Sequence, residues 1–520
     1  MCKSCNVCNG CDSGVSRRSF LGMTGAVTGG LLLSGGFGGV ASADQPAIRR
    51  VTGPFSTSDW DQQPPVRIYV VYLGVGGGPW PEPAEFVDTE EIQNVFAPCL
   101  DEIKTKLGDV EFVGGDLIPN DPGAASALLP KIAEQQSDAI LVIHLAFGWS
   151  EPFLIFESTG LPVAIYSQPF SGHDWMYVPR MQREGRRIII STSHDLREVE
   201  RLVRILRVPP RMKNAKIVCV AHPAAVVGTP AARNFARIKA KFGTEVIAVP
   251  VEELVEIHRT IPDNIAIAEA EEYWISQAKE IREPSREEII KSCKTYFALK
   301  QLMERHRAIA ITMQCLGTGP THIIGYPCLA FSRILDGGGI GACEVDMDST
   351  LTMMLMLYST GLPGFLMNTV MEHSTNSAIH THCVATTKMA GFDTERLPFT
   401  IRTHTETLAG AAVRVLMSRD IGQEITRAKL ANLETILAST GVLRGDFEFG
   451  DRGCRTRVIT DVTSSTSREL FDKWGGNVLG YDIGAVLLHR VMFYGDHLVN
   501  FRDIAQLMGL KVMIEGKDFA

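Results

Sequence analysis

Short, unbroken apolar segments recur along the first 312 residues and alternate with segments of helical spacing. The expected strands are residues 66–72, 139–143, 162–166, 187–190, 216–220, 245–249 and 308–312. The expected helices include residues 89–107, 196–206 and 263–307. A strand that is apolar on both faces is typical of a parallel sheet covered by helices on each side. The pattern therefore predicts two Rossmann-like α/β domains with parallel sheets, divided near Pro209-Pro210.

The last third of the chain has a different sequence pattern. Beyond Gly361 the segments are short and are separated by Gly and Thr, which indicates a mainly β domain; residues 424–440 interrupt it with a helix-like pattern. The predicted organisation is a signal peptide at 1–43, a linker at 44–65, an N-terminal α/β domain at 66–210, a middle α/β domain at 211–360 and a mainly β domain at 361–520.

The N-terminus resembles an export signal. Arg17-Arg18 is followed by a weakly apolar run, residues 26–40, and by Ala41-Ser42-Ala43. This order is typical of twin-arginine (Tat) signals, so we expect cleavage after Ala43 and a periplasmic protein; a Sec signal or a flexible tail is the alternative. The C-x-x-C run, made of Cys2, Cys5, Cys8 and Cys11, would be removed with the signal, unless it serves as a transient metal or redox tether.

Composition excludes two classes of partner. The net charge is −8, from 51 Lys and Arg against 59 Asp and Glu, and no long basic run occurs, which disfavours nucleic-acid binding. Outside the N-terminus no stretch approaches the roughly 18 apolar residues that a membrane span requires. The common signatures of P-loop NTPases, serine hydrolases and zincins do not occur, and a dinucleotide fingerprint after the first strand fails because its third glycine falls at Pro79.

An acidic pair in an apolar context is the strongest candidate for a site. Glu344 and Asp346 are flanked by apolar residues, where burial would be costly without a cation or hydrogen-bond partners. If residues 379–384 form a strand, His380 and His382 project from the same face. Glutamate and histidine together suit manganese, iron or zinc. The alternative is that these histidines lie on the surface or are hydrogen-bonded in the core.

An ordered series of motifs resembles a known family. The series comprises Cys343-Glu344-Val345-Asp346, Gly361-Leu362-Pro363-Gly364-Phe365 with Asn368, His382-Cys383, residues 402–406, Gly453-Cys454-Arg455-Thr456 and residues 488–496. Over roughly residues 310–520 the chain resembles the L-fucose/L-arabinose isomerase superfamily, particularly its fucose-isomerase-like branch. The resemblance implies an isomerase-like C-terminal domain and an aldose–ketose isomerase, with a sugar as the small-molecule substrate and an enediolate intermediate. A homo-oligomeric assembly is left open.

The resemblance also implies roles for individual residues. Mn²⁺, or another divalent metal such as Fe²⁺, would be held by Glu344, Asn368, His382 and His489. The residues assigned to substrate binding are Asn368, His404 and Arg455, and those assigned to catalysis are Glu344, Asp346 and Glu372. The metal would stabilise the enediolate while a carboxylate moves the carbon-bound proton.

Two positions depart from the family pattern. Val345 replaces the glycine between the two acids, which crowds the turn. Asn368 stands where the sugar isomerases place a second Asp or Glu, and an amide cannot accept and hold a proton at neutral pH. Glu372 or Asp346 would then have to supply the base. Two alternatives therefore stay open: an exported carbohydrate-binding or non-isomerising relative with a structural or lost metal, and an H-x-H metal hydrolase.

Overall fold

The computed structural model describes residues 63–74, 89–145, 148, 150–169, 173–315, 323–448, 450, 453–474 and 488–518, which all belong to one compact unit. The expected export signal and most of the expected linker lie outside the described residues. Among the helices that the structure describes, none is long and apolar enough to cross a membrane.

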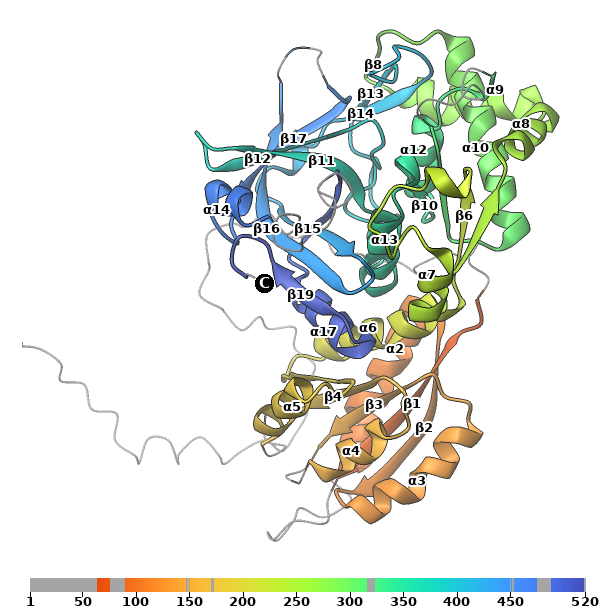
Figure 1. The fold of residues 1–520 in the computed structure, drawn as a ribbon. Helices are drawn as coiled ribbons and strands as arrows, with labels where there is room; N and C mark the ends of the chain where they lie inside the picture. Colours follow the sequence, from red (N-terminus) through yellow and green to blue (C-terminus); the bar gives the residue numbers. More distant parts are fainter. Residues whose placement is uncertain are drawn as a thin grey trace, which may run out of the picture. The chain divides into compact units, whose positions relative to one another are not determined.

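The first sheet has five parallel strands in the order β2-β1-β3-β4-β5 (Figure 1). Its strands are β1 (Val66–Gly74), β2 (Val110–Pro119), β3 (Ala139–His144), β4 (Val163–Ser167) and β5 (Ile188–Thr192). Its helical segments are η1 (Ile92–Phe96), α2 (Ala97–Leu107), α3 (Pro122–Glu134), α4 (Glu151–Glu157) and α5 (Asp174–Arg183). Every side chain of β3 and β4 is buried, as the continuous apolar runs predict.

The edge strand β2 has no counterpart among the strands expected from the sequence. Gly114 and Gly115 both have positive φ, 81° and 84°, and the register with β1 shifts next to them, between Val70 and Val71. This bulge interrupts the regular pattern of strand residues, because two glycines stand where side chains would otherwise pack.

The second sheet has four parallel strands in the order β10-β9-β6-β7. Its strands are β6 (Lys216–Val220), β7 (Glu245–Val249), β9 (Ala310–Met313) and β10 (Ile340–Ala342). The helical segments between β5 and the end of this unit are α6 (Arg197–Asn214), η2 (Pro223–Ala225), α7 (Phe235–Phe242), α8 (Val251–Thr260), α9 (Asp263–Glu269), η3 (Ala270–Trp274), η4 (Ile275–Gln277), α10 (Arg286–His306), α12 (Cys328–Asp336), η5 (Cys343–Val345) and α13 (Met347–Thr360). The prediction of two parallel-sheet α/β units is confirmed.

The expected division of the chain near Pro209-Pro210 does not interrupt the helix there, because α6 runs through both prolines without a break. Arg207 in this helix is fully buried; its Nη2 atom donates to Asp109 Oδ2 at 2.5 Å and its Nη1 atom donates to the carbonyl of Tyr358 at 3.1 Å. Asp109 lies next to the first sheet and Tyr358 lies in α13, so the helix contacts both α/β units. Packing of this kind outweighs the cost of roughly 3 kcal/mol that a proline imposes inside a helix.

The expected long helix at residues 263–307 is also wrong in part. The structure has two helices, α9 and α10, and between them the short strand β8 (Glu280–Ile281). Pro284 disfavours helical geometry in the residue before it, and Ser285 then caps α10 by accepting a hydrogen bond from the backbone N–H of Glu288. β8 instead pairs with β13 (Phe399–Arg402), which also pairs with β14 (Ala412–Val415).

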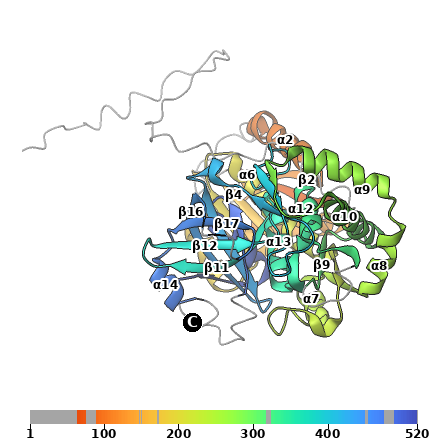
Figure 2. The ribbon, with the colours of Figure 1, turned by 90° about the horizontal axis from the view of Figure 1, so that it is seen from above.

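The C-terminal part is a six-stranded antiparallel barrel, which confirms the expected mainly β domain (Figures 1 and 2). Its strands follow the order β15-β18-β11-β12-β17-β16, and β16 pairs with β15 to close the ring. They are β11 (Phe365–Glu372), β12 (Ser377–His382), β15 (Glu424–Ala431), β16 (Thr435–Asp446), β17 (Thr456–Val462) and β18 (Arg490–Tyr494). The remaining elements are η6 (Ser418–Asp420), α14 (Ser467–Asp472), α17 (Leu498–Met508) and β19 (Lys511–Ile514), the last of which pairs in parallel with β16.

The helix expected at residues 424–440 is wrong, because this segment is the β15–β16 hairpin. Asn432 and Leu433 both have positive φ, 54° and 61°, as a tight hairpin turn requires. Nearly every side chain of β15 is buried, so the strand lacks the apolar–polar alternation that marks a strand with one solvent-exposed face.

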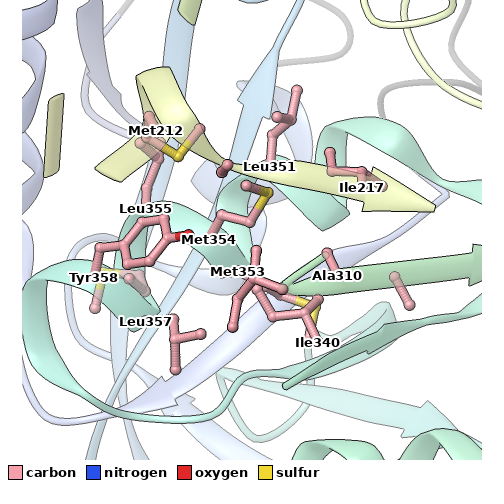
Figure 3. Packing of buried hydrophobic residues seen from close by; sticks show 14 of the residues in the cluster. Met212, Ile217, Ala310, Ile340, Leu351, Met353, Met354, Leu355, Leu357 and Tyr358 are labelled. Carbon is pink, nitrogen blue, oxygen red and sulfur yellow. The ribbon is translucent and has the colours of Figure 1, made fainter. Parts of the chain in front are cut away.

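Helix α13 lies at the centre of the main hydrophobic core (Figure 3). Its side chains from Met347 to Ser359 are all buried, and Figure 3 shows Leu351, Met353 and Met354 near Met212 of α6 and Ile340 of β10. A helix whose side chains are all buried, the polar Asp348 and Thr352 included, is enclosed on every side. Its N-terminus, which follows directly on Glu344 and Asp346, is therefore held rigidly.

Candidate metal centre

Glu344 lies in a tight turn where the parallel strand β10 ends and α13 begins. The turn places Glu344 and Val345 in the left-handed region, with φ of 59° and 57°. This conformation favours glycine and is uncommon for a β-branched residue. Val345, which replaces the glycine of the family pattern, therefore stands at a strained position. Strain of this kind costs on the order of 1–3 kcal/mol and is often found at functional sites.

Glu344 is flanked by two buried histidines that come from different parts of the barrel. The Nε2 atom of His382 lies 3.6 Å from Glu344 Oε1, and the Nε2 atom of His489 lies 3.8 Å from Glu344 Oε2. The two imidazole rings are 5.1 Å apart in an edge-to-face arrangement. The histidine side chains are at most 3% exposed and Glu344 is 25% exposed, so the carboxylate is the member of the trio that reaches solvent.

The two ring nitrogens of His489 have different surroundings. Its Nδ1 atom lies 3.0 Å from Asp346 Oδ2. Its Nε2 atom is buried and has no hydrogen-bond partner within the part of the chain that the structure describes. A histidine that is held by a carboxylate through one nitrogen and presents the other is the usual arrangement of a metal ligand. Burial lowers the pKa of His489, which favours the neutral imidazole that binds a metal.

Asp346 is held in a fully buried network. Its Oδ2 atom accepts hydrogen bonds from Lys429 Nζ at 3.0 Å and from Ser349 Oγ at 2.9 Å, and its Oδ1 atom caps α13 by accepting from the backbone N–H of Ser349. Burial alone would raise the pKa of Asp346, but the charge of Lys429 and the hydrogen bond with His489 hold it below the usual range. Asp346 therefore orients His489 and stays ionised.

Lys429 is a residue that the sequence analysis missed. It lies on β15, in the segment expected to be helical, and its side chain is fully buried. Its charge also acts on Asp348, whose pKa burial and the nearby Asp346 raise to about 6. A lysine between apolar neighbours, Ala428 and Leu430, is the one signal in the sequence that points to a buried role.

Asn368 lies next to this centre. Its Nδ2 atom donates to the carbonyl of Leu488 at 2.9 Å, and Leu488 directly precedes His489. Continuing the β11–β18 register by one residue places Asn368 opposite His489. Because the amide nitrogen is used by the backbone, Oδ1 is the atom of Asn368 that can accept a hydrogen bond or bind a cation.

Two other predicted residues lie elsewhere. Glu372 lies four residues beyond Asn368 on an extended strand, roughly 13 Å along it, and its carboxylate accepts hydrogen bonds from the backbone and side chain of Ser374. His380 shares a strand with His382, but its ring nitrogens contact the hydroxyls of Thr369 and Thr460, as in a hydrogen-bonded core histidine. The structure therefore does not bring either residue to Glu344.

The residues assigned to sugar binding have partners of their own. The Arg455 guanidinium donates to the backbone carbonyl of Thr403 at 2.7 Å and to the Thr403 hydroxyl at 3.0 Å, which fixes the loop before His404. The His404 imidazole lies 3.0 Å from the carboxylate of Glu406 and belongs to a second cluster, which includes Cys383.

The donors around Glu344 fit a divalent metal. Cys343, Glu344 and His382 each place a donor atom within 4.8 Å of the other two, and His489 Nε2 lies 3.8 Å from Glu344 Oε2. The hydrogen bond with Cys315 and burial raise the pKa of Cys343, so it stays a neutral thiol, and the carboxylate and two imidazoles, with the Asn368 amide nearby, suit Mn²⁺, Fe²⁺ or Zn²⁺. A metal held here would give the buried Nε2 atom of His489 the partner that it does not have among the described residues.

Comparisons with known proteins do not extend the resemblance seen in the sequence. No family model matches the chain, and no curated protein matches it. A solved structure of an ABC transporter periplasmic solute-binding protein from Actinobacillus succinogenes 130z, with bound D-allose, is 10% identical; the match covers 56% of this chain and 91% of that chain with a TM-score of 0.17. Similarity this low bears on neither the fold nor the function of the chain.

Proposed function

We propose that this protein is a metal-dependent enzyme that interconverts an aldose and a ketose, with a divalent metal held by Glu344, His382 and His489. The buried Nε2 atom of His489 carries the proposal: it lies 3.8 Å from the Glu344 carboxylate and has no hydrogen-bond partner among the described residues. Bound Mn²⁺ or Fe²⁺ supplies Lewis-acid polarisation of neighbouring sugar oxygens. The choice of reaction follows the motif resemblance over residues 310–520.

In this proposal different residues bind the sugar, transfer the proton and orient the metal ligands. Glu344 takes the proton from C2 of the aldose and returns it to C1, while the proton of the C2 hydroxyl passes to O1 through water. Glu344 has this role because it is the partly exposed carboxylate of the site. Asn368 accepts a hydrogen bond from a sugar hydroxyl through Oδ1. Asp346 holds His489 and is not the base, since its oxygens already accept from Lys429 and Ser349. His404 and Arg455 act in this proposal by fixing the loop at residues 403–406, and neither contacts the sugar directly.

The metal-binding part of the proposal predicts losses of bound metal in three variants. Glu344→Gln, His382→Ala and His489→Ala should each weaken Mn²⁺ binding by more than about tenfold, since even changes outside the ligand shell commonly cost that much. Metal content after dialysis, measured by elemental analysis, reports the loss. Glu372→Gln and His373→Ala are matched controls, because they remove the same groups from residues on or just after β11, and both should keep wild-type metal content. Wild-type content in all three site variants would contradict the ligand assignment.

The isomerase part is tested by hydrogen exchange. Metal-loaded protein incubated with a panel of aldoses in D₂O should place deuterium at C2 of the recovered aldose, because the proton taken by Glu344 exchanges with solvent. Glu344→Gln should abolish the exchange and Glu372→Gln should retain it. The measurement is mass spectrometry or NMR of the recovered sugar.

One observation favours a second candidate, a sugar-binding protein that does not isomerise. The position of the second family carboxylate is Asn368, and neither Asp346 nor Glu372 is placed to replace it. A sugar that binds to fully metal-loaded protein without deuterium exchange would support this candidate and reject the isomerase.

A further inference from the structure

A second cluster of metal-binding side chains lies beside the first, where four chain segments meet. Cys383 directly follows β12 and Cys454 lies just before β17, while His404 and Glu406 lie in the loop between β13 and β14. The register pairs His382 with Thr456, so Cys383 and Cys454 lie at neighbouring strand ends.

The donor atoms are spaced as the ligands of one metal ion. One donor atom each from Cys383, His404 and Glu406 lies within 4.8 Å of the other two. His404 Nε2 is 3.0 Å from Glu406 Oε2, and Cys454 Sγ is 3.8 Å from Glu406 Oε1. Zinc bonds of 2.0–2.3 Å in a tetrahedron separate neighbouring ligand atoms by about 3.3–3.8 Å. The donor atoms of Cys383, His404 and Glu406 are therefore close to this spacing, and rotation of the Cys454 side chain, whose thiol lies beside Glu406, would supply a fourth donor.

The cluster is held in place by contacts that do not use its donor atoms. His404 Nδ1 lies 3.1 Å from the Thr407 hydroxyl, which leaves Nε2 facing the cluster, and the ring stacks on Tyr326 at 4.7 Å between centroids. The Thr405 hydroxyl donates to the carbonyl of Gly453 at 3.0 Å, so the two loops that carry the donors are tied together. Such support from outside the ligand set orients a metal-binding histidine and fixes its tautomer.

We propose that Cys383, His404, Cys454 and Glu406 form a zinc site that is separate from the centre at Glu344. Two thiolates, an imidazole and a carboxylate are a ligand set that zinc favours, and the thiolates disfavour Mn²⁺. Cys383 and His404 are buried and the Glu406 side chain is 53% exposed, so Glu406 is the ligand on the solvent side. The site clamps the β13–β14 loop to the ends of β12 and β17. It shares no ligand with Glu344, His382 and His489.

Zinc content in a background that lacks the first site tests this proposal. The full chain carrying Glu344→Gln, together with Cys2→Ser, Cys5→Ser, Cys8→Ser and Cys11→Ser to remove the C-x-x-C run, is reduced, loaded with Zn²⁺ and dialysed. It should retain about one zinc per chain. Adding Cys454→Ser or His404→Ala should lower zinc affinity by more than about tenfold, as loss of a ligand does. Adding Cys99→Ser, which changes a half-buried cysteine on α2, should leave zinc content unchanged.

Cobalt substitution adds a readout that does not depend on content alone. Co²⁺ in the Glu344→Gln protein should show the near-ultraviolet charge-transfer absorption of thiolate ligands, and this band should weaken in Cys454→Ser. Absence of zinc from the Glu344→Gln protein, or zinc retained in both Cys454→Ser and His404→Ala, would overturn the proposal. A disulfide between Cys383 and Cys454, found by mass spectrometry of peptides from protein purified without reductant, would also overturn it.

Discussion

Replacing Lys429 with methionine should lower the free energy of unfolding by about 3–5 kcal/mol, the usual cost of removing one partner of a buried ion pair. Lys429 Nζ lies 3.0 Å from Asp346 Oδ2, and both side chains are fully buried. Methionine keeps most of the volume, so the loss reports the charge and not a cavity. Equilibrium denaturation in guanidinium chloride measures the change.

Two variants separate the charge effect from general disruption. Lys511→Met changes an exposed lysine on β19 of the same sheet and should alter stability by less than about 0.5 kcal/mol. Asp346→Asn in the Lys429→Met background should recover part of the loss, because no uncompensated carboxylate then remains at that position. A double variant as unstable as the single one would contradict this assignment.

The same pair predicts a pH dependence. Lys429 holds the pKa of Asp346 below its usual value, so the stabilisation is present above the unfolded pKa of about 4 and is lost as the pH falls below it. The stability difference between wild type and Lys429→Met should therefore keep nearly its full value from pH 7 down to about pH 4 and shrink as the pH falls below about 4. A difference that grows toward acid would contradict the role of Asp346.

Asp336→Ala should also cost about 3–5 kcal/mol, because it leaves several buried donors without an acceptor. The Asp336 carboxylate accepts hydrogen bonds from the hydroxyl of Thr386 at 2.7 Å, from the backbone and hydroxyl of Thr387 at 2.7 and 2.6 Å, and from Tyr273 at 3.0 Å. These bonds hold the segment that follows His382 and Cys383, so metal binding should weaken in parallel with stability.

The matched control for Asp336→Ala is Asp393→Ala, an exposed acid in the same loop region that should change stability by less than about 0.5 kcal/mol. Denaturation curves and metal content measured on the same preparations test both effects. Wild-type stability in Asp336→Ala would show that the loop is held by its remaining contacts.

The candidate site was only partly predictable from the sequence. Glu344 and His382 stood out because acidic and imidazole groups in apolar contexts need partners, and His489 followed from the motif order. The sequence did not show that Glu372 lies along the strand and away from the site, since residues four apart are close on a helix and distant on a strand. It also did not show that Cys454 meets Cys383, because that contact depends on the pairing of β12 with β17.

The sequence by itself determined the two parallel α/β units, because apolar runs of strand length report burial on both faces wherever they occur. Only the tertiary structure decided that residues 424–440 form a hairpin and that α6 passes through Pro209-Pro210. In both places, segments that are distant in the sequence bury the side chains. This packing outweighs the local helix and strand propensities. The same enclosure places Lys429 beside Asp346 and leaves His489 Nε2 facing Glu344, which no pattern along the chain records.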